Sequence, residues 1–237
     1  MTAPALSRPA RIGVLASGGG SNLQALFDHF DGAGAGLADI QWVGSDKLLA
    51  GSLKRARDRD VPADHIDHGN ATLLLDTLAT FRIELLVLAG YLKFVPEPVT
   101  RAYRGRIVNI HPSLLPSFGG AGMYGMRVHA AVIAAGAKLS GATVHFVDDA
   151  FDRGPIIAQW PVPVLPQDTP DTLGHRVLAV EHLLFPRAVA AVASGYARLG
   201  DDNRVILGAV SAYADQPFAF SGMLPADAMN LLLPVTP

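Results

Sequence analysis

Residues 11–30 read RIGVLASGGGSNLQALFDHF, and this stretch decides the fold class. Its apolar run over 12–16 is typical of a strand buried on both faces of a parallel sheet. A glycine-rich turn over 17–22 ends the run, and a helix follows for which Ser21 or Asn22 is the expected cap. Apolar residues at helical spacing indicate this helix: Leu23, Leu26, Phe27 and Phe30. A buried strand, a glycine turn and an amphipathic helix in this order predict the start of an α/β fold.

The same alternation continues along the chain. Further strands are expected at 40–43, 85–89, 106–111, 143–147 and 156–164. Further helices are expected at 48–60, from Asn70 to about 82, at 128–135 and at 172–193. The alternation predicts a mostly parallel twisted sheet flanked by helices, and the length of the chain allows one domain or two. We expect a flexible N-terminus over 1–10 and a C-terminal extension over 198–237, packed on or beside the domain.

Composition and charge exclude several classes of protein. The chain has 237 residues, 50% of them hydrophobic and 17% charged, and its mean hydropathy is +0.29. This is too apolar for a disordered chain, yet runs such as 85–92 are far shorter than the roughly 20 apolar residues of a membrane helix. The net charge of −2, without a long run of one sign, argues against a nucleic-acid or anionic-membrane partner.

Zero cysteines exclude disulfides, thiolate zinc sites and cysteine nucleophiles. Residues 1–10 contain no apolar signal core, so we expect a cytoplasmic protein. The histidines are scattered, and the closely spaced pair His65 and His68 lies in a connecting segment, so we expect no metal site. The sequence does not fix the oligomeric state.

The glycine-rich turn is a candidate anion site. Glycines let the backbone approach a ligand closely, and the start of the next helix offers free N–H groups. Gly18-x-Gly20 begins like a dinucleotide fingerprint, but Leu23 stands at the third glycine position and no acid stands at the end of the second strand. A phosphate site and a plain tight turn both remain open.

Asn109 and His111 form a second candidate, in the run Asn-Ile-His-Pro-Ser-Leu-Leu-Pro over 109–116. They alternate on one face at the carboxyl end of a strand, where open α/β sheets bind ligands. A carboxamide can stabilise an oxyanion, and an imidazole can move a proton near neutral pH. The alternative is a histidine at the strand end whose ring is only capped by backbone groups.

The acidic run 148–155 is a third candidate. A carboxylate there, such as Asp152, is able to orient His111 and stabilise its charge. The alternative is an acidic surface turn. The two residues are 152 − 111 = 41 positions apart, so spacing does not decide between these interpretations.

At these motifs the chain resembles the glycinamide ribonucleotide formyltransferases, a branch of the folate-dependent formyltransferases. The resemblance covers residues 11–197 and rests on the blocks 17–24, 88–92, 109–116, 141–146 and 152–155. It implies a single domain over 11–197 with a Rossmann-like formyltransferase fold. It implies transfer of a formyl group from 10-formyltetrahydrofolate, the co-substrate, to the amine of glycinamide ribonucleotide in purine biosynthesis. The amine would attack directly through a tetrahedral intermediate, and no metal would be needed.

The resemblance also implies a role for individual residues. The catalytic residues would be Asn109, His111 and Asp152. Gly20, Ser21 and Asn22 would hold the substrate phosphate, and Glu181 would contact the glycinamide. The folate pocket would be lined by Leu92, Lys93, Phe94, Val95, Ile107, Val147 and Asp148.

The sequence departs from the family pattern at several places. Arg153 stands where a glycine is common and Lys93 stands where Arg is frequent, and two further departures concern ligand contacts. The loop over 117–125 is longer than usual, so its contacts are open. His68-Gly69-Asn70 stands where some members place Arg or Lys near the phosphate, so that contact is either absent or made by His68.

Three alternatives fit the sequence less well. A methionyl-tRNA formyltransferase would need a further C-terminal domain and a basic surface. A formyltetrahydrofolate hydrolase would need an N-terminal regulatory domain. The alternative from another class is a non-catalytic nucleotide-binding α/β module.

Overall fold

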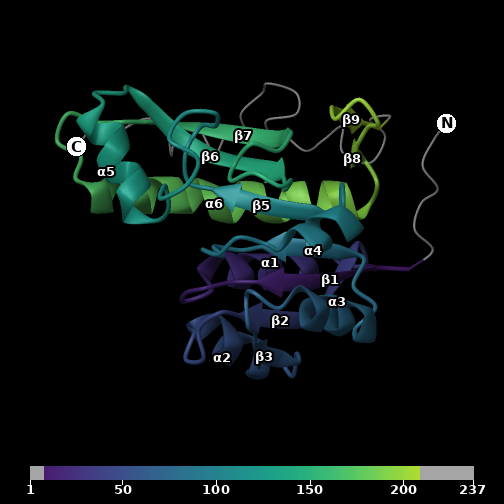
Figure 1. Ribbon diagram of the computed structural model, residues 1–237. Helices are drawn as coiled ribbons and strands as arrows, with labels where there is room; N and C mark the ends of the chain where they lie inside the picture. The colour runs from purple at the N-terminus through teal and green to yellow at the C-terminus, as the bar shows by residue number, and fades with distance from the viewer. Residues whose placement is uncertain (1–7, 209–237) are drawn as a thin grey trace.

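The computed structural model of the chain describes residues 8–208, and a seven-stranded sheet forms its centre (Figure 1). The strand order is β3-β2-β1-β4-β5-β6-β7. The strands are β1 (Ala10–Leu15), β2 (Ala38–Ser45), β3 (Ala63–His65), β4 (Leu85–Leu88), β5 (Ile107–His111), β6 (Leu139–Phe146) and β7 (Ile156–Pro163). Strands β1 to β5 pair in parallel, and β6 and β7 add antiparallel pairs at one edge. The expected mostly parallel α/β sheet is therefore confirmed.

Helices cover both faces of the sheet. They are α1 (Ser21–Asp31), α2 (Gly51–Arg57), α3 (Ala71–Thr80), α4 (Glu97–Ala102), α5 (Met126–Ala134) and α6 (Pro170–Ala193). One buried cluster joins the sheet to α1, α2, α5 and α6, and a second joins its other face to α3 and α4. In Figure 1 the long helix α6 runs along β5, β6 and β7. This three-layer arrangement explains why the central strands β1 and β4 are almost wholly apolar.

The structure corrects two expected helix boundaries. The cap of α1 is Gly20, not Ser21 or Asn22, and it makes no side-chain capping bond. Gly20 has φ 77°, and a Cβ there would lie 2.8 Å from Ser52 Cα, so both the left-handed backbone and the close approach of α2 require glycine. Helix α2 covers Gly51–Arg57 rather than 48–60.

Three further features differ from expectation. Strand β3 and helix α4 were not predicted, because each is very short. Strand β2 continues to Ser45, and Asp46 follows it directly with a side chain 1% exposed. The expectation that no acid stands at the end of the second strand is therefore wrong.

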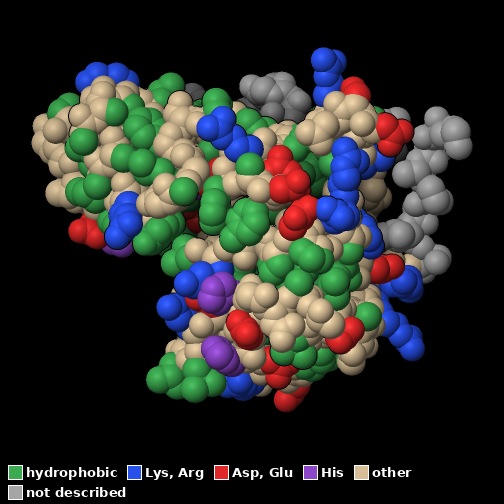
Figure 2. Space-filling view, viewed as in Figure 1, with side chains coloured by type: hydrophobic (Ala, Val, Ile, Leu, Met, Phe, Trp, Pro, Cys, Tyr) green, Lys and Arg blue, Asp and Glu red, His purple; other side chains and the backbone are tan. Residues whose placement is uncertain are grey.

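After α6 the chain forms a small antiparallel pair, β8 (Ala197–Leu199) with β9 (Val205–Leu207). The expected domain boundary after 197 falls inside β8. Residues 1–7 of the expected N-terminal segment and 209–237 of the expected extension lie outside the described residues. None of the described helices is long and apolar enough to cross a membrane. The face seen in Figure 2 carries basic and acidic side chains interspersed.

Candidate active site

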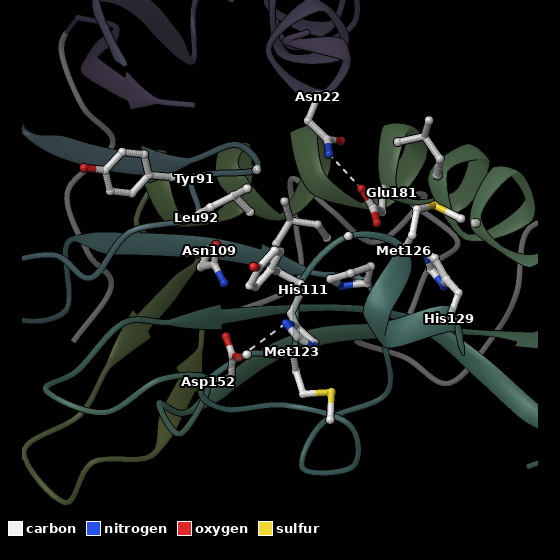
Figure 3. Close-up of a pocket in the computed structure, with 18 of the residues that line it drawn as sticks. Asn22, Tyr91, Leu92, Asn109, His111, Met123, Met126, His129, Asp152 and Glu181 are labelled. Carbon is white, nitrogen blue, oxygen red and sulfur yellow. Dashed lines mark hydrogen bonds and ion pairs between the residues drawn. The ribbon is translucent and has the colours of Figure 1, made fainter. Parts of the chain in front are cut away.

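A pocket of about 440 Å³ lies at the carboxyl ends of the parallel strands, where doubly wound sheets bind ligands. The ends of β4 and β5 form its floor, and the loop before α5, the loop after β6 and one face of α6 form its walls. Figure 3 shows these elements bringing side chains from distant parts of the sequence together. The polar side chains that line it are Asn22, Tyr91, Asn109, His111, Tyr124, His129, Asp152, Asp171, His175 and Glu181.

His111 is 3% exposed at the end of β5, and both of its ring nitrogens face oxygen atoms. Nε2 donates a hydrogen bond to the Phe118 carbonyl at 2.9 Å, and Nδ1 lies 3.4 Å from Asp152 Oδ2 (Figure 3). Burial lowers the pKa of His111, and this outweighs the opposing effects of Asp152 and the Phe118 carbonyl. The ring is therefore neutral at neutral pH, and its unprotonated nitrogen can accept a proton.

Asp152 lies close to His111 in spite of the 41 intervening positions. Burial acts to raise the pKa of its carboxyl group, but the neighbouring His111 and the Gly120 N–H help to lower it below the ordinary value. The Gly120 N–H donates to Oδ2 at 2.9 Å. The backbone of Asp152 has φ 55°, a left-handed conformation that aspartate tolerates better than most residues. Asp152 is therefore held as an anion against the imidazole.

Asn109 is half-buried two residues before His111 and pairs across the sheet with His145 of β6. His145 Nδ1 donates to the Phe146 carbonyl at 2.8 Å, which leaves Nε2 as an acceptor in the neutral ring. Asn109 Nδ2 donates to this Nε2 at 3.0 Å. His145 Nε2 also lies 3.7 Å from Asp152 Oδ1. The three predicted catalytic residues thus share one polar cluster with a fourth residue, His145.

The long loop over 117–125 contributes its backbone to this cluster. It supplies the Phe118 carbonyl to His111 and the Gly120 N–H to Asp152. A Cβ at Gly119 would lie 2.4 Å from Leu115 Cδ2 and 3.1 Å from Asp152 Cβ, so a larger residue here would displace the Leu115 side chain and press on Asp152. The loop therefore fixes the histidine and the carboxylate together.

Glu181 lies on the pocket face of α6 and is 7% exposed. Asn22 Nδ2 donates to its Oε2 at 2.7 Å (Figure 3). Burial raises the pKa of Glu181 to about 7, although the Asn22 bond acts in the opposite direction. This carboxyl group is therefore largely desolvated and close to half-protonated at neutral pH.

The predicted phosphate residues stand together at the start of α1, and only Asn22 among them lines the pocket. Ser21 borders a neighbouring groove, which also contains Arg55. Helix α2 holds the glycine turn, because Ser52 N–H donates to the Gly18 carbonyl at 3.1 Å and Arg55 Nε donates to the Gly19 carbonyl at 2.8 Å. These hydrogen bonds anchor the glycine turn to α2, and Asn22 at the start of α1 faces the pocket.

The predicted folate residues divide into three groups. Leu92 lines the main pocket. A small adjoining cavity, about 60 Å³ and bordered also by Asn109, His145 and Asp152, is lined by Lys93, Phe94, Val95, Val147 and Asp148. Ile107 lines neither space, because it is fully buried in the core against α3 and α4.

His68 is exposed and does not line the pocket. Within residues 8–208 no group of three or more His, Cys, Asp or Glu side chains is arranged to hold a metal ion.

Comparison of the chain with known proteins identifies its family. The formyl transferase family profile matches residues 10–189. The chain belongs to the formyl transferase family. It is 42% identical over 192 residues to the chloroplastic phosphoribosylglycinamide formyltransferase of Vigna unguiculata, covering 78% of this chain and 61% of that protein. The chain likewise spans 66% of the corresponding Arabidopsis thaliana protein, so it is shorter than both curated plant relatives. The cytoplasmic location expected above stays a prediction.

Solved structures in the family share the fold. Glycinamide ribonucleotide transformylase 1 from Symbiobacterium toebii superposes with a TM-score of 0.79 at 36% identity, covering 88% of this chain and 99% of that one. A formyltetrahydrofolate deformylase from Pseudomonas syringae superposes with a TM-score of 0.75 at 26% identity, covering 86% and 67%. A transformylase and a deformylase therefore both resemble this chain in architecture.

Several pocket residues of this family member were missed from the sequence. On α6 the missed residues share a face with Glu181 and recur at helical spacing: Asp171, Gly174, His175 and Leu178. That spacing is a signal that was available. His129 and Met126 come from α5, whose contact with the pocket depends on the long loop before it. His145 depends on the antiparallel register of β6, which no local pattern reveals.

Proposed function

We propose that this chain transfers the formyl group of 10-formyltetrahydrofolate to the amine of glycinamide ribonucleotide, as a step of purine biosynthesis. The observation that carries the proposal is the meeting of Asn109, His111 and Asp152 at one pocket. It is supported by relatives whose names state this reaction or purine biosynthesis. The chain would act on these two small molecules.

The ribonucleotide would lie along α1 and α6. Its phosphate would accept hydrogen bonds from N–H groups at the start of α1, near Gly20, Ser21 and Asn22, where the helix dipole favours an anion. Glu181, ten residues beyond Asp171 on the pocket face of α6, would contact the glycinamide. The amine would then lie toward the end of β5.

The folate would enter from the opposite side. The small cavity lined by Lys93, Phe94 and Val147 opens beside Asn109 and Asp152. A ligand spanning both spaces would bring its formyl group between the two substrate sites. The exposed rings of Phe94 and Phe151, whose centroids are 5.0 Å apart, stand at this entrance and offer apolar contact to an aromatic ligand.

In the proposed reaction the neutral amine attacks the formyl carbon. A carbon–nitrogen bond forms, and the carbonyl electron pair moves to oxygen. The Asn109 amide donates to that oxygen, a contribution typically worth about 3–4 kcal/mol per preorganised donor. His111 takes up the proton that the attacking amine loses, because Asp152 favours the imidazolium. This proton then passes to N10 of the folate, the bond from N10 to carbon breaks, and the formylated glycinamide ribonucleotide and tetrahydrofolate leave.

The proposal is tested with purified protein and both substrates. Asp152→Asn and His111→Ala are each expected to lower kcat by about 100-fold or more, while KM changes little. Asp149→Asn is the control, because this exposed neighbouring acid lines neither cavity. Near-normal turnover in both active-site variants would overturn the catalytic assignment.

Substrate choice needs a separate measurement. Ser21→Ala and Asn22→Ala are expected to raise KM for the ribonucleotide, and unchanged values would contradict the phosphate assignment. Release of formate from 10-formyltetrahydrofolate without added ribonucleotide, at the full rate, would instead identify a hydrolase. Binding of both ligands without any formyl transfer would identify a non-catalytic module.

A further inference from the structure

His145 carries an arrangement that the proposed reaction does not yet use. Its side chain is 2% exposed, and it lies opposite Asn109 in the antiparallel pair of β5 and β6. The register between β6 and β7 shifts at this residue, between Val144 and His145. Bulges of this kind change the direction of a side chain and are frequent beside active sites. The fold therefore directs His145 toward the catalytic cluster.

The Phe146 carbonyl determines which nitrogen of His145 carries the proton. It accepts from Nδ1 at 2.8 Å, so the neutral ring presents a bare Nε2. Gly154 makes this carbonyl position possible, because a Cβ at Gly154 would lie 1.8 Å from the Phe146 oxygen. The tautomer of His145 is thus fixed by the backbone of its own strand and by the glycine that packs on it.

The bare Nε2 in turn determines the orientation of the Asn109 side chain. A carboxamide can turn either its NH₂ group or its oxygen toward a neighbour, and only the NH₂ group can donate to Nε2. With Nδ2 held 3.0 Å from Nε2, the second hydrogen of the NH₂ group is left for the pocket that Asn109 lines. A ring protonated at Nε2 would turn the amide oxygen toward His145 instead.

We infer that His145 is a positioning residue that orients the Asn109 amide as a hydrogen-bond donor to the formyl oxygen. The inference rests on the proposed function for its catalytic consequence. His145 itself touches neither substrate in this role. Asp152 Oδ1, 3.7 Å from Nε2, is the charged group that faces the ring, and Asn109 is its hydrogen-bonding neighbour.

Two substitutions of His145 distinguish the roles of its two ring nitrogens. In His145→Gln the side-chain oxygen reaches the place of Nε2 and can accept from Asn109. In His145→Asn the shorter amide reaches only the place of Nδ1, so the partner of Asn109 is lost. We expect His145→Asn to lower kcat by about 100-fold, the typical effect of losing one oxyanion donor, with KM values nearly unchanged. His145→Gln is expected to stay within about 10-fold of wild type.

A second pair of variants tests whether His145 acts through Asn109. When Asn109 is already alanine, adding His145→Asn is expected to lower kcat by less than about 3-fold, because residues in one network are not additive. A full further loss in that background would overturn the inference. So would equal loss in His145→Gln and His145→Asn, since the ring would then act by itself, and so would near-normal turnover in both.

The tautomer of His145 can be determined without an activity assay. Nitrogen NMR of histidine-labelled wild-type protein is expected to show His145 with a protonated Nδ1 and a bare Nε2 at neutral pH. The side-chain amide signals of Asn109 are expected to move in His145→Asn and to stay in His145→Gln. A His145 protonated at Nε2 would refute the positioning role. A wild-type chain that shows the expected tautomer but no formyl transfer would refute the proposed function alone.

Discussion

Replacing Glu181 with glutamine is expected to stabilise the folded chain at alkaline pH and to have almost no effect in acid. Burial raises the pKa of this carboxyl group from 4.5 to about 7. Between these values the folded chain keeps a proton that the unfolded chain has lost. Unfolding then releases a proton, so the free energy of unfolding falls as pH rises through this window and is level outside it.

The magnitude follows from the difference in pKa. About 2.5 pKa units at 1.36 kcal/mol each correspond to about 3 kcal/mol. Glutamine keeps an oxygen that can accept from Asn22 and carries no charge to desolvate. Its advantage over glutamate should therefore grow from near zero at pH 4 to about 3 kcal/mol at pH 8. For a chain of this size that corresponds to roughly 6–12 °C in Tm.

The assay is thermal unfolding of wild type and Glu181→Gln from pH 4 to pH 8. Glu97→Gln is a suitable control, because the Glu97 side chain is 58% exposed and its substitution should show no comparable trend. A Tm difference between Glu181→Gln and wild type that is constant over this range, or absent at pH 8, would refute the reasoning. Either result would mean that ionisation of Glu181 is not coupled to folding.

Three further predictions concern stability and the loop that carries Asp152. The guanidinium of Arg176 on α6 lowers the pKa of Asp168 to about 2. Asp168 should therefore add about 2 kcal/mol to the free energy of unfolding above pH 4, and this contribution should be lost toward pH 2. Urea unfolding of Asp168→Asn should differ from wild type at pH 7 and converge with it in acid. Gly154→Ala forces a methyl group against the Phe146 carbonyl, so steady-state kinetics should show a large loss of kcat, and normal kcat would exclude the clash. A Cβ at Gly174 would lie 3.1 Å from the ring of His129. Gly174→Ala should therefore gain up to about 1 kcal/mol of helix stability only when His129 is also replaced by alanine. A double-mutant cycle measures this dependence, and an equal gain with and without His129 would contradict it.

The local pattern of the sequence predicted the elements whose hydrophobic spacing is complete. The strand and helix around the glycine turn are an example, because buried residues form a continuous run in the strand and recur at helical spacing in the helix. The cap at Gly20 was missed because its cause lies in Ser52, on the next helix. Helix α4 was missed because it has six residues and begins at a proline cap, too short for a helical period to show.

The candidate site follows the same division. Asn109 and His111 were found because they alternate on one strand and share its carboxyl end. The contact of His111 with Asp152 was suggested by chemistry, but it depends on how β6 and the following loop return to β5. His145 depends on the same return, and its importance becomes visible only with the register. Long-range strand pairing, rather than residue type, therefore limits prediction of this site.

The electrostatics of the pocket support different chemical roles for two of its acids, Glu181 and Asp152. Among the described residues that line it there is no Lys or Arg, and the basic groups are histidines. Burial shifts the pKa of Glu181 upward and that of His111 downward, so both move toward the neutral form. Asp152 moves the other way, because the neighbouring His111 and the Gly120 N–H stabilise its anion. Two carboxyl groups whose environments push their pKa values apart mark different chemical roles. The less charged Glu181 can bind beside an anionic substrate without strong repulsion, whereas Asp152 keeps the charge that an imidazolium needs.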